Sequence, residues 1–391
     1  MTKGLKAVCM LVTNIDAPTG GIQKNSKLLL GQLNARGIKT FVCTRNYHGL
    51  PANEIVNGTI FHRSPVVGNS LAVNGILYLA DTFFWLIKNR KKYEVVHCQQ
   101  MFGPTMTAVI AGFFTRKPIL TRITSGGAIG EANEIRRMPL SGLRIRLIKY
   151  VTRFVALTEE MKSELTGIGI SSENITVIHN STDIPSEVAY SSADKLTFKN
   201  RLDIPNVKIG IFTGRLSEEK CLDSLINAWK QVTEPFPDAI LLLLGEGGAF
   251  RNVEDSLRKQ VTDLGLESNV VFKGFVPNPK DYLIAADAFI LPSRSEGMSN
   301  SLVEAFACGS TIIASDIGAN REICIHDVNS LLFPVGGSER LAEHLIRVFS
   351  EQETAERLGE NARSLAEEEL TVERMTEKYL TEYIYIISDR T

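Results

Sequence analysis

Short apolar runs alternate with amphipathic segments along this chain, and the alternation occurs twice. In the first half, strand-like runs lie at 5–12, 38–43, 95–98, 119–123, 154–157 and 175–178, with helical patterns at 22–35 and 104–114. In the second half, strand-like runs lie at 208–213, 239–244, 270–272, 286–292, 311–314 and 330–333, with helical patterns at 222–232, 252–264 and 279–286. Strands that alternate with helices favour a parallel sheet covered by helices. We therefore predict an α/β fold with two such sheets.

A polar, turn-rich segment at 180–206 separates the two series and predicts a linker, and a length of 391 residues also suggests about two domains. We expect two doubly wound, Rossmann-like domains whose parallel sheets face a central cleft, the first at 1–190 and the second at 195–370. The last segment, 371–391, carries apolar residues on one side at helical spacing, so we expect it to pack back on the N-terminal domain. Ligands of such sheets bind beyond the carboxyl ends of the strands.

The composition is typical of a soluble globular protein, with 44% apolar and 22% charged residues. No run of 18 apolar residues occurs, which argues against a transmembrane helix. The first ten residues lead into a strand pattern without the layout of a secretory signal. The six cysteines form no Cys-x-x-Cys pair and lie mostly in apolar runs. We expect reduced thiols and a cytoplasmic protein.

The net charge of −1 conceals an asymmetry between the two halves. Residues 1–190 contain 22 Lys and Arg against 12 Asp and Glu, whereas the remainder contains 21 against 32. Basic and apolar residues occur together at 83–92 and at 140–153. Such segments can lie on a bilayer of anionic lipids, which would place the protein peripherally on the inner face of the membrane. The alternative is that both are ordinary core helices with solvated basic faces.

Two carboxylates, Glu296 and Glu304, lie eight residues apart across the end of a strand pattern and the start of a helical pattern. The backbone amides between them belong to Gly297, Met298, Ser299 and Asn300. Amides at a helix N-terminus bind anions, and an ionised carboxylate accepts hydrogen bonds from a sugar diol. A ligand with both phosphate and sugar fits this pattern. The alternatives are that Glu304 closes a capping box with Ser301 and that Glu296 is an exposed loop acid.

Arg215 and Lys220 follow the first strand pattern of the second half, with Arg215 directly after Gly214 and Lys220 five residues further on. A forked guanidinium and a point cation together suit a diphosphate whose charge grows as a bond breaks. A solvated basic loop is the alternative. In the first half, Gly20 and Gly21 precede a helix and would allow a ligand to approach the backbone closely, although a tight turn without function explains them equally well.

Other familiar signals are absent. No Gly-x-Gly-x-x-Gly follows the first strand pattern, no phosphate-binding Gly-x-x-x-x-Gly-Lys-Ser/Thr occurs, and there is no Asp-x-Asp. The histidines show no metal-ligand spacing, and we interpret His97 as a core histidine that has hydrogen-bond partners, the alternative being that it lines the cleft. We therefore expect neither a dinucleotide cofactor nor a metal, and nothing points to nucleic acid as a partner.

Taken together, these residues resemble the retaining glycosyltransferases of family 4, which have the GT-B fold. Glu296 and Glu304 match the family's E-x7-E motif, and the segment from Gly214 to Lys220 matches its G-R-L-x-x-x-K motif, with Cys221 in place of the usual glycine. The resemblance implies a hexosyl- or N-acetylhexosaminyltransferase. It would move a sugar from a UDP- or GDP-sugar to an acceptor hydroxyl, in a lipid-linked or surface-polysaccharide precursor. The second domain would bind the nucleotide sugar and the basic first domain the acceptor.

The resemblance also implies a role for each matched position. Arg215 and Lys220 would hold the donor diphosphate, Glu304 would bind the ribose, and Glu296 with the amides of residues 297–300 would contact the donor sugar and phosphate. Arg215, Lys220 and Glu296 form the expected catalytic set. The base would lie near Phe275 and Val276, and Gly20 and Gly21 would approach the phosphates from the other domain.

One departure from the family concerns the strand pattern at 119–123. Many members carry His-Gly after this strand, whereas this chain has Thr124 and Ser125 followed by two glycines. Either hydroxyl could contact the sugar or the acceptor, and Arg122 could add positive charge there or serve a structural role. The alternatives within the fold are a sugar-nucleotide epimerase or a phosphorylase, and outside catalysis a sugar-nucleotide-binding protein.

Overall fold

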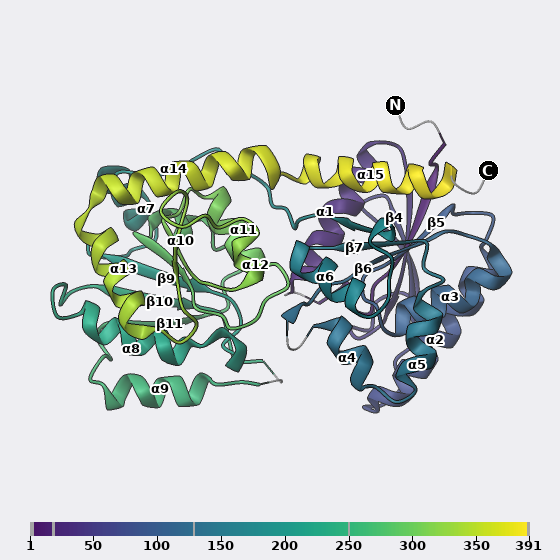
Figure 1. The fold of residues 1–391 in the computed structure, drawn as a ribbon, viewed down its shortest axis with the longest axis horizontal. Helices are drawn as coiled ribbons and strands as arrows, with labels where there is room; N and C mark the ends of the chain where they lie inside the picture. The colour runs from purple at the N-terminus through teal and green to yellow at the C-terminus, as the bar shows by residue number, and fades with distance from the viewer. Residues whose placement is uncertain (1–3, 18–19, 128–129, 249–250, 389–391) are drawn as a thin grey trace. The chain divides into compact units, whose positions relative to one another are not determined.

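The computed structural model describes residues 4–17, 20–127, 130–248 and 251–388. The chain divides into two compact units, shown in Figure 1. Unit 1 comprises Met1–Ser181 and Val372–Thr391, and unit 2 comprises Thr182–Thr371. The chain thus enters unit 2 inside the polar segment in which the sequence predicts a linker. That segment is not linker throughout, because helix α7 (Ser192–Arg201) forms within it.

Unit 1 contains one sheet whose strands lie in the order β3-β4-β2-β1-β5-β6-β7-β8. Their bounds are β1 Ala7–Leu11, β2 Lys39–Arg45, β3 Asn53–Val56, β4 Thr59–Ser64, β5 Val95–Cys98, β6 Ile119–Arg122, β7 Arg153–Ala156 and β8 Ile175–Val177. Neighbouring strands are parallel, as predicted, except for the hairpin of β3 and β4. The sequence analysis did not predict this hairpin. Its turn is Asn57-Gly58, with positive φ at both residues, which suits a two-residue hairpin turn.

Helices cover both faces of this sheet. Their bounds are α1 Gly21–Ala35, α2 Leu71–Lys88, α3 Gly103–Thr115, α4 Glu131–Arg137, α5 Ser141–Ile148, α6 Glu159–Gly167 and α15 Val372–Ser388. The C-terminal helix α15 packs against α1, and Figure 1 shows the two helices next to each other. Its residues Met375, Tyr379, Tyr383 and Ile386, spaced three or four apart, join the core formed by α1 and the strands.

His97 on β5 is a satisfied core histidine, as predicted. It is fully buried, and Nδ1 lies 2.6 Å from the Tyr383 hydroxyl of α15. Burial, together with the charge of Arg122, lowers the pKa of His97 to about 3. The imidazole is therefore neutral at ordinary pH, as a buried base without an acidic partner should be.

Unit 2 contains a parallel sheet in the order β11-β10-β9-β12-β13-β14. The strands are β9 Ile209–Thr213, β10 Ile240–Leu244, β11 Val270–Gly274, β12 Ala288–Leu291, β13 Ile312–Ser315 and β14 Leu331–Phe333. The helices are α7, α8 Leu222–Val232, α9 Glu254–Asp263, α10 Lys280–Ala285, α11 Asn300–Ala307, α12 Gly318–Arg321, α13 Ser338–Ser350 and α14 Gln352–Glu369. The strand order reverses between β9 and β12, which makes this pair the topological switch point.

Candidate functional site

The loops that follow β9 and β12 carry the predicted cations and the first predicted glutamate. Arg215 and Lys220 lie in the loop after β9, and Glu296 lies in the loop after β12. Because the two strands are neighbours in the sheet, their carboxyl ends open at the same edge. Ligands of doubly wound sheets bind at this edge, beside the switch point. The structure of unit 2 therefore brings these three residues to one place.

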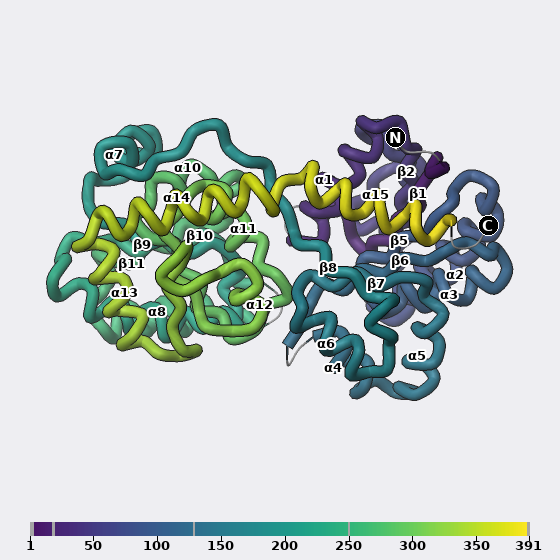
Figure 2. Tube along the Cα trace, turned by 45° about the horizontal axis from the view of Figure 1, so that its top comes forward, coloured from purple at the N-terminus to yellow at the C-terminus, as the bar shows by residue number. Residues whose placement is uncertain are grey.

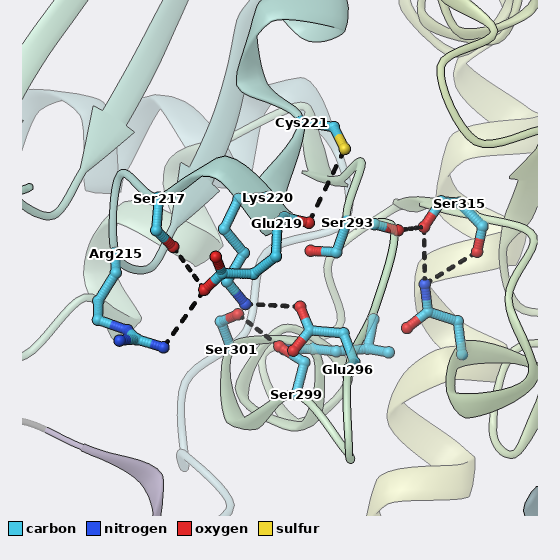
Figure 3. A network of polar contacts seen from close by, with 12 residues as sticks. Arg215, Ser217, Glu219, Lys220, Cys221, Ser293, Glu296, Ser299, Ser301 and Ser315 are labelled. Atoms are coloured by element: carbon cyan, nitrogen blue, oxygen red, sulfur yellow. Dashed lines mark hydrogen bonds and ion pairs between the residues drawn. The ribbon is translucent and has the colours of Figure 1, made fainter. Parts of the chain in front are cut away.

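Lys220 and Glu296 form an ion pair across the two loops. Lys220 Nζ lies 2.6 Å from Glu296 Oε1, and Figure 3 shows the two side chains pointing toward each other. Their side chains are only 12% and 10% exposed. The pair is thus largely withdrawn from water. In such surroundings a charge interaction is strong and an unpaired charge is costly. Glu296 is therefore not an exposed loop acid.

Arg215 lies next to a second carboxylate, Glu219, which the sequence analysis did not single out. The Ser217 hydroxyl donates to Glu219 Oε1 at 2.7 Å, and Arg215 lies 3.4 Å from the same oxygen (Figure 3). Burial opposes the ionised form of Glu219, but the hydrogen bond from Ser217 and the charges of Arg215 and Lys220 outweigh it and lower the pKa. The Arg215 side chain is 64% exposed, so its guanidinium can reach a ligand.

The end of the first loop, before α8, is held by Arg294 of the loop after β12. The Arg294 amide, from the loop after β12, donates to the Glu219 carbonyl at 2.9 Å. Cys221, which departs from the expected motif, adopts a left-handed conformation with φ 50°. Glycine takes this conformation without strain, whereas other residues do so at some cost. Arg294 Nε donates to Cys221 Sγ at 3.1 Å, a contact that glycine could not make.

Glycines let the loop after β10 lie against the loop after β9. A Cβ on Gly245 would lie 1.8 Å from the Gly214 carbonyl oxygen, and φ is 150° at Gly214 and 140° at Gly245. Any side chain at 245 would push the two strand ends apart. Gly214 thus shapes the site through its backbone.

Helix α11 follows Glu296 and begins with a serine cap. The Ser299 hydroxyl accepts from the Leu302 amide at 3.4 Å and lies 2.9 Å from the Ser301 hydroxyl. Since Ser299 is the N-cap, a capping box would need its acid at 302, and Glu304 lies beyond that position. The capping-box alternative for Glu304 is therefore wrong. Glu304 stands on the second turn of α11, and Gly297, Met298 and Asn300 lie between it and Glu296.

Buried polar atoms without hydrogen-bond partners gather at the same edge of the sheet. They are Thr213 Oγ1 at the end of β9, Glu219 Oε2, Ser293 Oγ after β12 and Asn320 Oδ1 after β13. Buried polar atoms are normally paired, so a cluster of unpaired ones at a ligand-binding edge indicates groups that a bound polar molecule or water completes. The sequence signal for Thr213 and Ser293 is a small polar residue at, or two positions after, the end of an apolar strand.

The predicted base-binding residues lie in the loop after β11. The Phe275 amide donates to Glu246 Oε1 at 3.2 Å, which ties this loop to the loop after β10. Phe275 is 45% exposed and Val276 is half-buried. Both residues stand at the carboxyl edge of the sheet, after β11, which β10 and β9 separate from β12.

The predicted residues of unit 1 have partners inside that unit. Arg122 is buried and donates to Gln99 at 2.8 Å and to Asn180. It therefore has the structural role that the sequence left open. The Thr124 hydroxyl and amide both donate to Oε1 of Glu131 at 2.7 Å. Glu131, missed in the sequence, is a buried acid whose pKa is raised by burial.

The remaining predicted residues of unit 1 stand in loops. The Ser125 carbonyl accepts from the Glu131 amide at 3.2 Å, and the Ser125 side chain is half-buried. Gly20 caps α1 with φ 133°, and Gly21 is the first helical residue. The left-handed φ explains why glycine stands at 20. Within the described ranges, no three His, Cys, Asp or Glu residues lie together as metal ligands would.

Two protein-family models match the chain. The model described as glycosyl transferases group 1 matches residues 194–365, and the model described as glycosyltransferase family 4 matches residues 19–184. The first range falls within unit 2. It includes the Arg215, Lys220, Glu296 and Glu304 positions.

Individual relatives are distant in sequence. The 2-deoxystreptamine N-acetyl-D-glucosaminyltransferase of Niallia circulans is 22% identical over 365 residues, covering 88% of this chain and 92% of that protein. The N-acetyl-alpha-D-glucosaminyl L-malate synthase of Bacillus anthracis is 28% identical over 236 residues, or 60% of each chain. The crystal structure of Anabaena Alr3699/HepE in complex with UDP-glucose has a TM-score of 0.78 at 20% identity, covering 97% of this chain and 99% of that one. This likeness confirms the predicted fold class.

Proposed function

The chain is a glycosyltransferase of the family 4 type with the GT-B fold, and we propose that it transfers a hexose or N-acetylhexosamine from a UDP- or GDP-sugar to an acceptor hydroxyl, with retention of the anomeric configuration. Two relatives are named for the transfer of N-acetylglucosaminyl groups, and the Anabaena neighbour was crystallised with UDP-glucose. These names favour a UDP-sugar over a GDP-sugar as the donor.

One observation carries the proposal. At the switch point of unit 2, Arg215 lies beside the carboxylate of Glu219, and Lys220 lies beside that of Glu296. In the proposed complex, Arg215 and Lys220 hold the diphosphate. An ammonium has three N–H donors, so Lys220 can keep its bond to Glu296 while it donates to phosphate oxygens. The exposed Arg215 guanidinium supplies a planar fork that matches a phosphate.

The catalytic contribution of these residues is stabilisation of the leaving group. As the glycosidic bond to the diphosphate breaks, negative charge grows on the departing oxygen, and fixed cations stabilise that charge without reorganising. The acceptor hydroxyl attacks on the same face of the sugar and passes its proton to the leaving diphosphate. Glu296 accepts hydrogen bonds from the donor sugar and holds Lys220 in place. Since two side-chain cations supply the positive charge, the proposal includes no metal or other cofactor.

The nucleoside is proposed to bind along the carboxyl edge. Glu304 accepts hydrogen bonds from the ribose hydroxyls, and the base lies near Phe275 and Val276. For the acceptor we propose a lipid-linked sugar or a surface-polysaccharide precursor, bound by unit 1. The charge bias of residues 1–190 supports an anionic partner such as a membrane surface on the cytoplasmic side.

A transfer assay with a panel of nucleotide sugars tests the proposal. We expect one UDP- or GDP-sugar to be consumed only when an acceptor is present, and nuclear magnetic resonance of the product to show the anomeric configuration of the donor. Conversion of the donor alone into an epimer would contradict transfer. A product of inverted configuration would contradict retention.

A further inference from the structure

Unit 1 exposes a continuous run of aromatic side chains on α2 and α3. Phe84 is 68% exposed, Phe113 56% and Phe114 67%. Phe83 links Phe84 to Phe114, with ring centroids 5.4 Å and 6.0 Å apart. Exposed aromatic residues that touch one another form a patch, and patches of this kind mark interaction sites.

The patch extends from α3 to α5. The ring of Phe113 lies 5.1 Å from that of Tyr150, which follows α5 and is 55% exposed. Leu140 and Leu143, at the start of α5, are 73% and 55% exposed. Figures 1 and 2 both show α2, α3 and α5 together on one flank of unit 1. We call the exposed apolar residues of these helices, with Tyr150, the aromatic face.

Basic residues stand next to the exposed aromatic residues in the sequence, and Asp81 of α2, which pairs with His62, is the one acid on α2, α3 and α5. Lys88 ends α2, Arg116 follows α3, and Arg146 and Lys149 lie on and after the last turn of α5, all of them exposed. In the sequence, residues 82–130 contain one acid, Glu94, and residues 135–158 contain none. Glu94 accepts hydrogen bonds from the backbone amides of Lys6 and Ala7. The surface is thus apolar at its centre and positive at its rim.

Helix α2 is embedded in the fold of unit 1 and does not stand apart from it. By length and composition, it is the one helix in the described part of the chain that could cross a membrane. However, Tyr78 and Leu86 of α2 are fully buried, and the Tyr78 hydroxyl donates to the Cys43 carbonyl of β2 at 3.3 Å. A helix that packs on its own sheet in this way is expected to lie on a bilayer surface with its outer side only.

We propose that the aromatic face of unit 1 docks on a bilayer of anionic lipids, with Phe113 and Phe114 inserted among the acyl chains and the basic rim on the lipid phosphates. This rests on the proposed function, because a lipid-linked acceptor is reached from such a surface. The sequence indicated two basic and apolar segments, 83–92 and 140–153, and the structure shows that α3 belongs to the same surface. It places Phe113 and Phe114 of α3 between them, because α3 contacts both α2 and α5. Charge complementarity selects anionic lipid, since a second copy of this chain would bring one positive rim against another.

Flotation of the full-length protein with vesicles tests the proposal. We expect binding to phosphatidylglycerol-containing vesicles at low salt, little binding to pure phosphatidylcholine, and loss of binding as salt rises. Phe113→Ser with Phe114→Ser should weaken binding at least tenfold. The matched control is Ile325→Ser with Val328→Ser, which removes two exposed apolar residues from unit 2 and should leave binding unchanged.

The charged rim is tested separately. Arg146→Glu with Lys149→Glu should weaken binding to anionic vesicles by more than the roughly fivefold per residue expected for loss of a basic residue alone. Arg258→Glu with Arg340→Glu, on helices of unit 2, is the matched control. Equal binding by both charge variants would overturn the assignment to this surface.

Insertion has its own readout. Compared with the unchanged protein, which contains Trp85 and Trp229, Phe114→Trp should show a larger shift of tryptophan emission to the blue on anionic vesicles and stronger quenching by brominated acyl chains. Absence of both effects would overturn insertion. If the protein bound no vesicles, and sedimentation showed a dimer that Phe113→Ser with Phe114→Ser dissociates, the aromatic face would be an interface between copies. Vesicle binding needs no nucleotide sugar, so its result is independent of the transferase assay.

Discussion

Lys220 Nζ lies 2.6 Å from Glu296 Oε1, and this pair joins the loops that follow the two strands at the switch point of unit 2. The cation proposed to hold the leaving diphosphate therefore also fixes the carboxylate proposed to contact the sugar. The same unit contains a second shielded pair, Lys199 with Asp287, at 3.1 Å and with side chains 5% and 8% exposed. Asp287 precedes β12, so this second pair lies at the opposite edge of the sheet. The two pairs allow stability and catalysis to be separated.

Lys220→Met should reduce both stability and turnover. It leaves Glu296 shielded without its cation, which costs on the order of 3 kcal/mol, and removes a charge from the diphosphate site. Lys199→Met leaves Asp287 in a similar position and should lower stability by a similar amount without changing kcat. Urea unfolding and steady-state kinetics of the two variants check this. Equal turnover in the two variants would show that Lys220 has a structural role only.

Arg215→Ala should reduce kcat with little effect on stability, because its side chain is 64% exposed and the pair with Glu219 is at 3.4 Å. Loss of one charge-stabilising donor costs roughly 10²–10³ in turnover. Arg258→Ala removes a partly exposed ion pair with Glu254 on α9 of unit 2 and should leave kcat unchanged. Full transferase activity in both Arg215→Ala and Lys220→Ala would refute the diphosphate assignment.

Glu304→Ala should weaken donor binding through the ribose. A hydrogen bond to a charged group contributes about 1.5–3 kcal/mol, so the Kd for the nucleoside diphosphate should rise roughly 10- to 100-fold. The 2′,3′-dideoxy nucleoside diphosphate should bind the variant and the unchanged protein alike, because it lacks the hydroxyls in question. Calorimetric titration measures both. If the variant discriminates between the two nucleotides as the unchanged protein does, Glu304 does not bind the ribose.

Because of His97, the free energy of unfolding should decrease as the pH is lowered from about 6.5. The folded-state pKa of His97 is lowered to about 3, so between these values the unfolded chain binds a proton that the folded chain does not. The free energy of unfolding therefore falls by up to about 1.4 kcal/mol per pH unit as pH decreases through this window. His97→Gln should be less stable at pH 7 and show a shallower dependence. An unchanged slope would mean that other groups dominate.

The order of most elements was predictable because apolar runs of four to seven residues mark strands that are buried on both faces. Arg215, Lys220 and Glu296 were recognisable because they follow such runs. The β3–β4 hairpin was missed although Asn57-Gly58 carries a strong turn signal. Helix α7 was missed because its polar composition resembles a linker, whereas its residues Lys195 and Phe198 are buried in unit 2.

The partners of the charged residues could not be predicted, because they depend on which strands are neighbours. Lys220 and Glu296 are 76 residues apart, and they meet because β12 lies beside β9 after the crossovers of β10 and β11. Glu131 is an example from unit 1. Nothing in the sequence distinguishes it from a surface acid, yet it accepts hydrogen bonds from Thr124 and from the Met101 amide.

Calorimetric titration of a nucleotide sugar into three proteins tests the diphosphate site most directly. The panel of UDP- and GDP-sugars is first screened by thermal stabilisation, since a ligand at 100 times its Kd adds about 2.7 kcal/mol to the free energy of unfolding. The selected donor is then titrated into the unchanged protein, Lys220→Met and Lys199→Met. We predict at least tenfold weaker binding to Lys220→Met and unchanged binding to Lys199→Met. Equal affinity for all three proteins would contradict a diphosphate site built on Lys220.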